Sequence, residues 1–265
     1  MLIQLLQTLI LGLVQGISEW LPISSTAHLK IAGDFLGLAV TPLFNIILHL
    51  GTLTVLIFFF RGEIKNVLAA LVRLDFRSEN GMLIPRIVLA TIPTAIIGVV
   101  YNQYLQDTFG TISIIAVTFI IGATFVYTTK FAKENQDILS YRIALLMGIA
   151  QGFAIFPGLS RSGITISAAL LLGLTRGKAF KFSFMLSIPA IIGDFALEVF
   201  SQRKIELTSG VTGIETVAGF AVAALVGYFS LKLLSRVVQG MKFHYFAYYT
   251  WVMGISLLIW TVLVS

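Results

Sequence analysis

Six long apolar runs divide the chain, and each is close in length to a helix that crosses a bilayer. Such a helix needs about 20 predominantly apolar residues. The runs therefore predict six full transmembrane helices. They lie at residues 43–60, 83–101, 110–129, 180–200, 213–235 and 245–264.

Two further apolar regions, residues 1–38 and 139–175, are broken by glycines, prolines and polar clusters. Irregular backbone is tolerated at membrane depth only where it is buried in protein or lines a wet cavity. We therefore expect two re-entrant helix pairs, each of which dips into the membrane and returns to its starting side. The predicted fold is an all-α polytopic membrane protein, with residues 1–265 as a single membrane domain.

The broken regions resemble each other. In "GLVQGISEWLPISSTAH" and "GIAQGFAIFPGLSRSGI", a shift of 136 positions places Gly12, Gln15, Gly16 and Ser24 on identical residues, and it also superimposes the apolar runs of the two halves. The chain therefore reads as two repeats, residues 1–129 and 137–265. Three crossings in each half would make the second repeat inverted relative to the first.

Composition supports a membrane protein, since 57% of the residues are hydrophobic and 11% are charged, with a mean hydropathy of +0.95. A soluble domain averages about 25% charged residues. The absence of cysteine excludes disulfides and thiolate metal sites. The net charge of +6 is explained by cations in the short gaps between apolar runs, so no nucleic-acid partner is expected.

The positions of these cations predict the orientation of the chain. With both termini outside, fourteen lysines and arginines face the cytoplasm, whereas Lys30, Arg203 and Lys204 lie outside and Arg161 falls in a broken segment. The opposite orientation would reverse this bias. The positive-inside rule therefore favours a multi-pass protein of the cell membrane with both the N-terminus and the C-terminus outside.

The first broken region carries unusual polar chemistry. Gln15 and Glu19 are four residues apart and share one helical face. An ionised carboxylate in hydrocarbon is costly and needs a cation, a donor or water. Ser24, Ser25 and Thr26 follow Pro22 and can cap the next helix. His28 lies within reach of Ser25 on that helix, where it can serve as a general acid or base or simply join helices.

The second broken region carries "PGLSRSGIT" at residues 157–165. Ser160 and Ser162 supply hydroxyls, and Arg161 supplies a permanent cation with a fork of donors. The helix expected over residues 164–174 points its N-terminus at this loop, which suits an anion. Arg161 there suits a phosphate oxygen. One half thus offers acid–base chemistry or metal ligation, and the other offers an anion cradle.

Three motifs are similar to those of the undecaprenyl-diphosphate phosphatase family, the bacitracin-resistance proteins. They are Gln15-Gly-Ile-Ser-Glu19, "PISSTAH" at Pro22–His28, and "PGLSRSGIT" at Pro157–Thr165, and the likeness spans nearly the whole chain. The resemblance implies an enzyme that removes the terminal phosphate of a polyprenyl diphosphate. The product is the monophosphate carrier of cell-envelope synthesis, and the active site would face outside.

The resemblance also implies a role for each matching residue. Glu19, with Gln15, would hold Mg²⁺ or Ca²⁺, and Ser25 would attack or position the terminal phosphate. His28 would carry protons or itself attack, and activated water is a third candidate nucleophile. Arg161 would stabilise the reacting phosphate. Further phosphate contacts would come from Ser24, Thr26, Ser160, Ser162 and Thr165.

One departure from the family pattern bears on the metal. Gln15 replaces the glutamate that the family often has, which removes one negative charge from the expected cation site. Two other interpretations stay open. Arg161 could bind an anionic headgroup in a transporter or flippase of a phosphorylated lipid, or in a binding protein without turnover. The chain could also assemble as a homodimer.

Overall fold

The computed structural model describes residues 2–38, 42–201 and 213–264. This part of the chain consists of helices joined by turns and loops, and its only extended pairing is an isolated bridge between Gln136 and Leu174. Arg203 and Lys204, which the charge argument used, lie outside the described residues. In chain order the elements are α1 (Leu2–Ser18), α2 (Ser25–Leu36), α3 (Pro42–Phe59), α4 (Arg61–Val72), α5 (Leu83–Tyr104), α6 (Gln106–Phe109), α7 (Ile112–Thr128), η1 (Thr129–Phe131), α8 (Tyr141–Phe153), α9 (Arg161–Leu171), α10 (Arg176–Ser201), α11 (Gly213–Gln239), η2 (Phe243–Tyr245) and α12 (Phe246–Val264).

The predicted membrane-spanning helices are present. Among the described residues, five helices are long and apolar enough to cross a bilayer, and a sixth span is formed if α3 and α4 are counted together. The chain bends by 76° between those two helices. The all-helical polytopic membrane fold is therefore confirmed, and the run predicted at 43–60 corresponds to α3.

The two broken regions form pairs of short helices, as expected. The pair α1 and α2 is separated by residues 19–24, and the pair α8 and α9 by residues 154–160. Helix α9 begins at Arg161, which is earlier than the start predicted at residue 164, because the Ser160 hydroxyl accepts a hydrogen bond from the Gly163 N–H and caps the helix there. Arg161 thus lies in the first turn of α9.

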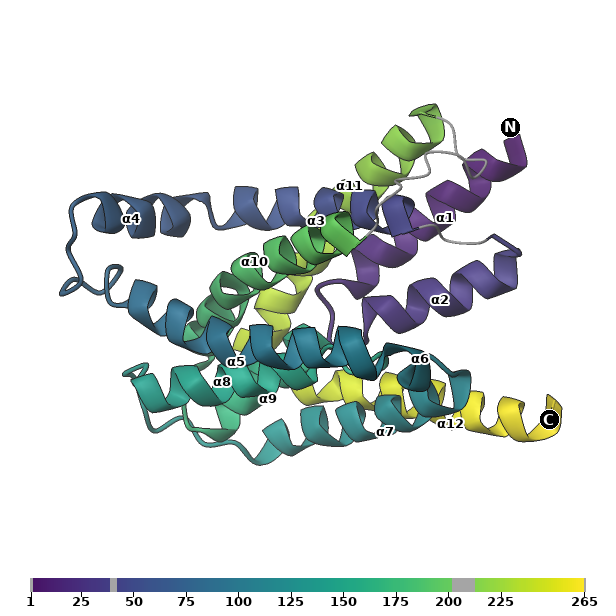
Figure 1. Cartoon of the computed structure of the whole chain (residues 1–265). Coiled ribbons are helices and arrows are strands. Elements are labelled where there is room, and N and C mark those ends of the chain that lie inside the picture. The colour runs from purple at the N-terminus through teal and green to yellow at the C-terminus, as the bar shows by residue number, and fades with distance from the viewer. Residues whose placement is uncertain (1, 39–41, 202–212, 265) are drawn as a thin grey trace.

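Helix packing exchanges partners between the halves. Helix α1 packs along α11, and α8 packs along α5, while α7 and α12 lie side by side (Figure 1). With the predicted shift of 136 positions, α8 is the counterpart of α1 and α11 is the counterpart of α5. Each of these two contacts therefore joins a helix of one half to a helix of the other, and the predicted shift relates one contact to the other.

Glycines at equivalent positions permit these close contacts. A Cβ at Gly12 would lie 2.7 Å from the carbonyl oxygen of Gly219 on α11. A Cβ at Gly148, the residue 136 positions later, would overlap the carbonyl oxygen of Ala90 on α5. Both crossings thus depend on the absence of a side chain.

An aromatic cluster closes the interior beside the two loops. The ring of Trp20 contacts that of Phe184 at a centroid distance of 5.6 Å, and Phe184 also packs on Phe60 and Phe180. All four side chains are buried. Trp20 directly follows Glu19, so this apolar packing holds one wall of the polar region described next.

Candidate active site

The two helix-pair loops meet inside the bundle and hydrogen-bond to each other. The Ser162 hydroxyl donates to the Trp20 carbonyl at 2.7 Å, and the Ser160 hydroxyl donates to the Leu21 carbonyl at 3.3 Å. In the other direction, the Gly158 N–H donates to the Ser24 hydroxyl at 3.1 Å. These three hydrogen bonds, together with the bond between Arg161 and Glu19 described below, join the two loops directly.

The backbone at these contacts is unusual. Ser24 has a φ of 70°, in the left-handed region that non-glycine residues rarely adopt, and the neighbouring Gly158 has a φ of 97°. Thr118 of α7 donates to the carbonyl of Pro157, and a Cβ on Gly158 would collide with the Thr118 hydroxyl. Such conformations persist where the surrounding structure holds them, commonly at functional sites.

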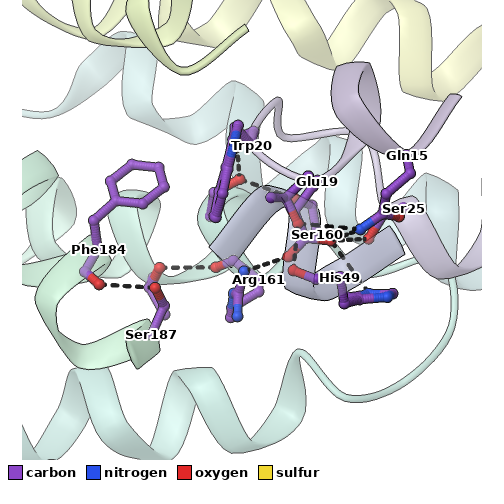
Figure 2. A network of polar contacts seen from close by, with 12 residues as sticks. Gln15, Glu19, Trp20, Ser25, His49, Ser160, Arg161, Phe184 and Ser187 are labelled. Atoms are coloured by element: carbon purple, nitrogen blue, oxygen red, sulfur yellow. Dashed lines mark hydrogen bonds and ion pairs between the residues drawn. The ribbon is translucent and has the colours of Figure 1, made fainter. Parts of the chain in front are cut away.

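Glu19 is the centre of the polar network (Figure 2). Its side chain is 4% exposed, and its two oxygens have different partners. Oε1 accepts from the Arg161 guanidinium at 2.6 Å. Oε2 accepts from Gln15 Nε2 at 3.0 Å and from the Ser25 hydroxyl at 2.8 Å. A carboxylate buried in this way is stabilised by its cation and its donors.

Arg161, in the second half of the chain, pairs with Glu19 in the first half. Its side chain keeps 20% exposure, and its guanidinium lies 5.9 Å from the centre of the Trp20 ring. One guanidinium nitrogen binds Glu19. Because the guanidinium has five N–H donors, it can bind Glu19 and a phosphate oxygen at the same time.

Ser25 is placed as a nucleophile would be. Its hydroxyl donates to a carboxylate at 2.8 Å, and its side chain is only partly buried. The carboxylate is itself oriented by Gln15 and Arg161. A hydroxyl bonded to a base, with the base oriented by a third group, is the arrangement typical of activated nucleophiles.

His28 lies apart from this network. Its Nδ1 is 2.8 Å from the Ser24 carbonyl oxygen, and its Nε2 is 2.8 Å from the Tyr249 hydroxyl on α12. A ring nitrogen facing a carbonyl must donate, so Nε2 is left to accept from Tyr249. The expectation that His28 meets the Ser25 hydroxyl on one helical face is therefore wrong in this conformation, because both ring nitrogens have other partners.

The other residues predicted to contact phosphate differ in burial and in their hydrogen-bond partners. Thr165 donates to the Arg161 carbonyl at 2.7 Å and contacts the Ser183 hydroxyl at 2.5 Å. Thr26 is exposed. The hydroxyls of Ser160 and Ser162 are buried and bonded between the loops. Ser24, Ser160 and Ser162 thus join the two loops, and Thr165 joins α9 to Ser183 of α10.

Two residues from outside the three motifs join the site. His49 of α3 places Nε2 at 3.4 Å from Glu19 Oε2, and its Nδ1 is 2.9 Å from the Asn45 carbonyl oxygen. Thr52, one turn further along α3, is 3.5 Å from Gln15 Nε2. A histidine and a threonine spaced by three in an apolar helix share one face, which is the signal that could have grouped them with Glu19.

The residues of the site can hold a hard divalent cation only if substrate phosphates and water supply the remaining oxygen ligands. The described residues hold no cluster of three or more His, Cys, Asp or Glu side chains suited to a metal. However, Gln15 Oε1 is buried without a hydrogen-bond partner, close to the Glu19 carboxylate. Mg²⁺ is commonly bound through one or two protein oxygens, with the remaining ligands from substrate phosphates and water. That pattern matches the donors available here.

Taken together, these features define a polytopic helical membrane protein with a buried ion pair between two broken helix pairs. The sequence profile described as "Bacitracin resistance protein BacA" matches residues 8–256, and the chain belongs to this family. The likeness identified from the motifs is thereby confirmed.

Relatives of the chain match it along nearly its whole length. A protein of Carboxydothermus hydrogenoformans named undecaprenyl-diphosphatase is 38% identical over 96% of this chain and 96% of its own length. Proteins with the same name from Korarchaeum cryptofilum and Treponema denticola are 36% and 38% identical, each over 96% of this chain and over 98% and 96% of their own lengths.

Proposed function

We propose that the chain hydrolyses undecaprenyl diphosphate to the monophosphate, and so recycles the lipid carrier of cell-envelope synthesis and confers resistance to bacitracin. The ion pair between Glu19 and Arg161 carries this proposal, because it joins the first and the third family motif in one site at a distance of 2.6 Å. The names of the relatives point to the same substrate.

In the proposed reaction, Ser25 Oγ attacks the terminal phosphorus and its proton passes to Glu19, to which it is already hydrogen-bonded. The bond between that phosphorus and the bridging oxygen breaks, and the electron pair leaves with the polyprenyl monophosphate. Water then hydrolyses the phosphoserine. Arg161 stabilises the charge on the phosphoryl oxygens, which is where such sites supply most of their catalysis.

His28 enters the proposal as a proton carrier. Its bond to the Ser24 carbonyl fixes the tautomer and leaves Nε2 as the basic nitrogen. That nitrogen becomes available to the reaction only when the Tyr249 hydroxyl releases it. Thr26 and the hydroxyls of the Arg161 loop are proposed to contact the phosphates after the loops rearrange around the substrate.

The proposed cation is Mg²⁺ or Ca²⁺, held by Glu19 and by the unpartnered oxygen of Gln15. When bound, it would offset the negative charge of the diphosphate and of the leaving phosphate. The single carboxylate predicts a weak site that forms fully only with substrate present.

The topology is also proposed. Six spans and two re-entrant pairs would put both termini on the same side of the membrane, and the distribution of cations favours the outside. The two repeats, residues 1–129 and 137–265, would then be inverted relative to each other, with the active site open to the outside. Helix α1 begins and α12 ends at the same end of the molecule (Figure 1), which agrees with an even number of crossings. A homodimer is proposed for the assembly, to be tested by the mass of the protein in nanodiscs.

Release of inorganic phosphate from purified protein with farnesyl or longer polyprenyl diphosphates tests the proposal. We expect turnover that chelator abolishes and that Glu19→Gln removes while the protein still folds. A phosphorylated Ser25 trapped by rapid acid quench would support the covalent step. Transfer of labelled lipid across vesicles without phosphate release would instead favour the transporter or flippase.

A further inference from the structure

Helix α4 departs from the direction of the spanning bundle. It is bent by 76° from α3 at Phe60. Helix α3 packs along α11, which is long and apolar enough to cross the bilayer, so a helix at this angle to α3 runs close to the plane of the membrane. Arg61 and Lys65 lie in its first two turns and are exposed, so α4 lies at the edge of the hydrocarbon rather than within it.

The surface of α4 divides into three faces. Val67 and Ala70 face the protein, where Ala70 is buried and Val67 packs on the core. Leu68, Leu71 and Val72, spaced at three and four residues, share a second face and are 54%, 43% and 84% exposed. The third face is polar. It carries Asn66 and, just past the end of the helix, Arg73, whereas Arg61 and Lys65 lie at the N-terminal end of the second face, one to two turns before Leu68 and Val72.

The end of α4 keeps an exposed leucine in a strained conformation. The Asp75 N–H donates to the Ala70 carbonyl at 2.9 Å and the Leu74 N–H donates to the Leu71 carbonyl at 3.0 Å, which is a Schellman motif. Leu74 has a φ of 52° at the position where glycine is favoured, and it is 72% exposed. An L-residue adopts this left-handed conformation only at a cost in free energy. A costly, exposed apolar side chain indicates a partner outside the chain.

The cations on this segment indicate the chemistry of that partner. Arg61, Lys65, Arg73 and Arg77 border the apolar face, and all four are exposed. Of the nearby acids, Asp75 accepts hydrogen bonds from the backbone N–H groups of Arg77 and Ser78, which hold the pKa of its carboxyl below the ordinary value. Asp75 therefore stays ionised, and with Glu63 it leaves four cations against two carboxylates over residues 61–77, so the segment keeps a net positive charge.

We propose that residues 61–77 form an interfacial segment that binds anionic phospholipid headgroups. The apolar face of α4, extended by Leu74, enters the acyl boundary, and the bordering cations contact the phosphates. Long basic side chains suit this position because their apolar stems lie along the hydrocarbon while their charges reach the headgroups. The inference does not depend on the proposed enzymatic activity.

Depth measurements test the placement of the apolar face. The chain has no cysteine, so single cysteines can be labelled with an environment-sensitive fluorophore. The pair is Leu71→Cys on the apolar face and Asn66→Cys on the polar face of the same helix. In vesicles of phosphatidylcholine and phosphatidylglycerol, we expect a lipid-borne quencher to reach position 71 and aqueous iodide to reach position 66. Equal quenching of positions 66 and 71 by iodide would overturn the proposal. A fluorescence signal at position 71 that changes with the density of protein in the vesicles would also overturn it, because it would indicate contact with a second copy of the chain.

Lipid selectivity tests the charge. We expect Lys65→Gln with Arg73→Gln to lower the preference for labelled phosphatidylglycerol over phosphatidylcholine by about fivefold for each charge removed. The control removes two exposed charges elsewhere, Lys133→Gln with Arg142→Gln, and should leave the preference at this segment unchanged. Equal losses in both double variants would show a diffuse charge effect and contradict a specific surface.

Leu74→Gly separates membrane contact from folding. Glycine relieves the positive φ, so the unfolding temperature in detergent should rise. At the same time the fluorophore at position 71 should become more accessible to iodide in vesicles. Unchanged accessibility would contradict the part assigned to Leu74.

Discussion

The Arg161 guanidinium and the Glu19 carboxylate, 142 positions apart in the chain, form an ion pair of 2.6 Å between the two helix-pair loops. The pair is nearly buried, and its partners come from different halves. A buried charge is tolerable only with its counter-charge. Each half therefore completes the site of the other.

Removing one partner of this pair should cost stability as well as activity. We expect Arg161→Met to lower the unfolding temperature strongly, because loss of one partner of a buried pair costs about 3–5 kcal/mol. Glu19→Gln should cost less, since Arg161 is 20% exposed and can be hydrated. The double variant should recover much of the stability and none of the phosphate release. A double variant no more stable than Arg161→Met would show that the two charges are not coupled.

His28 and Tyr249 allow the proton-carrier role to be tested. We expect His28→Asn to lower kcat by at least about a hundredfold, the usual size of an acid–base contribution, although asparagine can still donate to the Ser24 carbonyl. Tyr249→Phe keeps the stacked ring and frees Nε2, so its kcat should stay near that of the parent. Substantial activity in His28→Asn would assign His28 to positioning of the Ser24 loop alone.

The sequence was sufficient for the helices and for the central pair. Apolar runs, broken segments and charged residues inside them are local signals, and they gave the spanning helices and the grouping of Glu19 with Gln15 and Arg161. The run predicted at 43–60 ends where the chain bends, but the direction of α4 after Phe60 was not predicted, because it is set by packing.

The partners of polar side chains were harder to predict. Ser24 was one of three residues expected to be able to cap α2; it occupies the N-cap position, but its side chain accepts a hydrogen bond from Gly158 in the other half. The spacing of three residues predicted that His28 lies within reach of Ser25, but the Nε2 atom of His28 contacts the Tyr249 hydroxyl of α12 instead. His49 joined Glu19 through contact between helices. These outcomes depend on distant segments, about which local spacing carries no information.

The equivalent glycines at the two helix crossings should be equally intolerant of a side chain. Gly12→Ala and Gly148→Ala would each force a Cβ against a backbone carbonyl, so both should lower the unfolding temperature. Gly62→Ala, in α4, has open space within 4 Å and should be neutral or slightly stabilising. Thermal unfolding in one detergent compares the three variants. A harmless alanine at position 148 alone would mean that α8 can move away from α5.

The cation site should respond to the charge at position 15. Gln15→Glu places a second carboxylate beside Glu19 and replaces the amide nitrogen that now donates to it at 3.0 Å. Without metal the two like charges repel, so the unfolding temperature in chelator should fall. With Mg²⁺ the second carboxylate adds a hard oxygen ligand, so half-maximal phosphate release should need less Mg²⁺ than in the parent. The control Thr52→Val alters the other neighbour of Gln15 without adding charge and should leave the Mg²⁺ requirement unchanged. If Gln15→Glu changed neither the stability in chelator nor the Mg²⁺ requirement, Gln15 would not be a ligand of the cation.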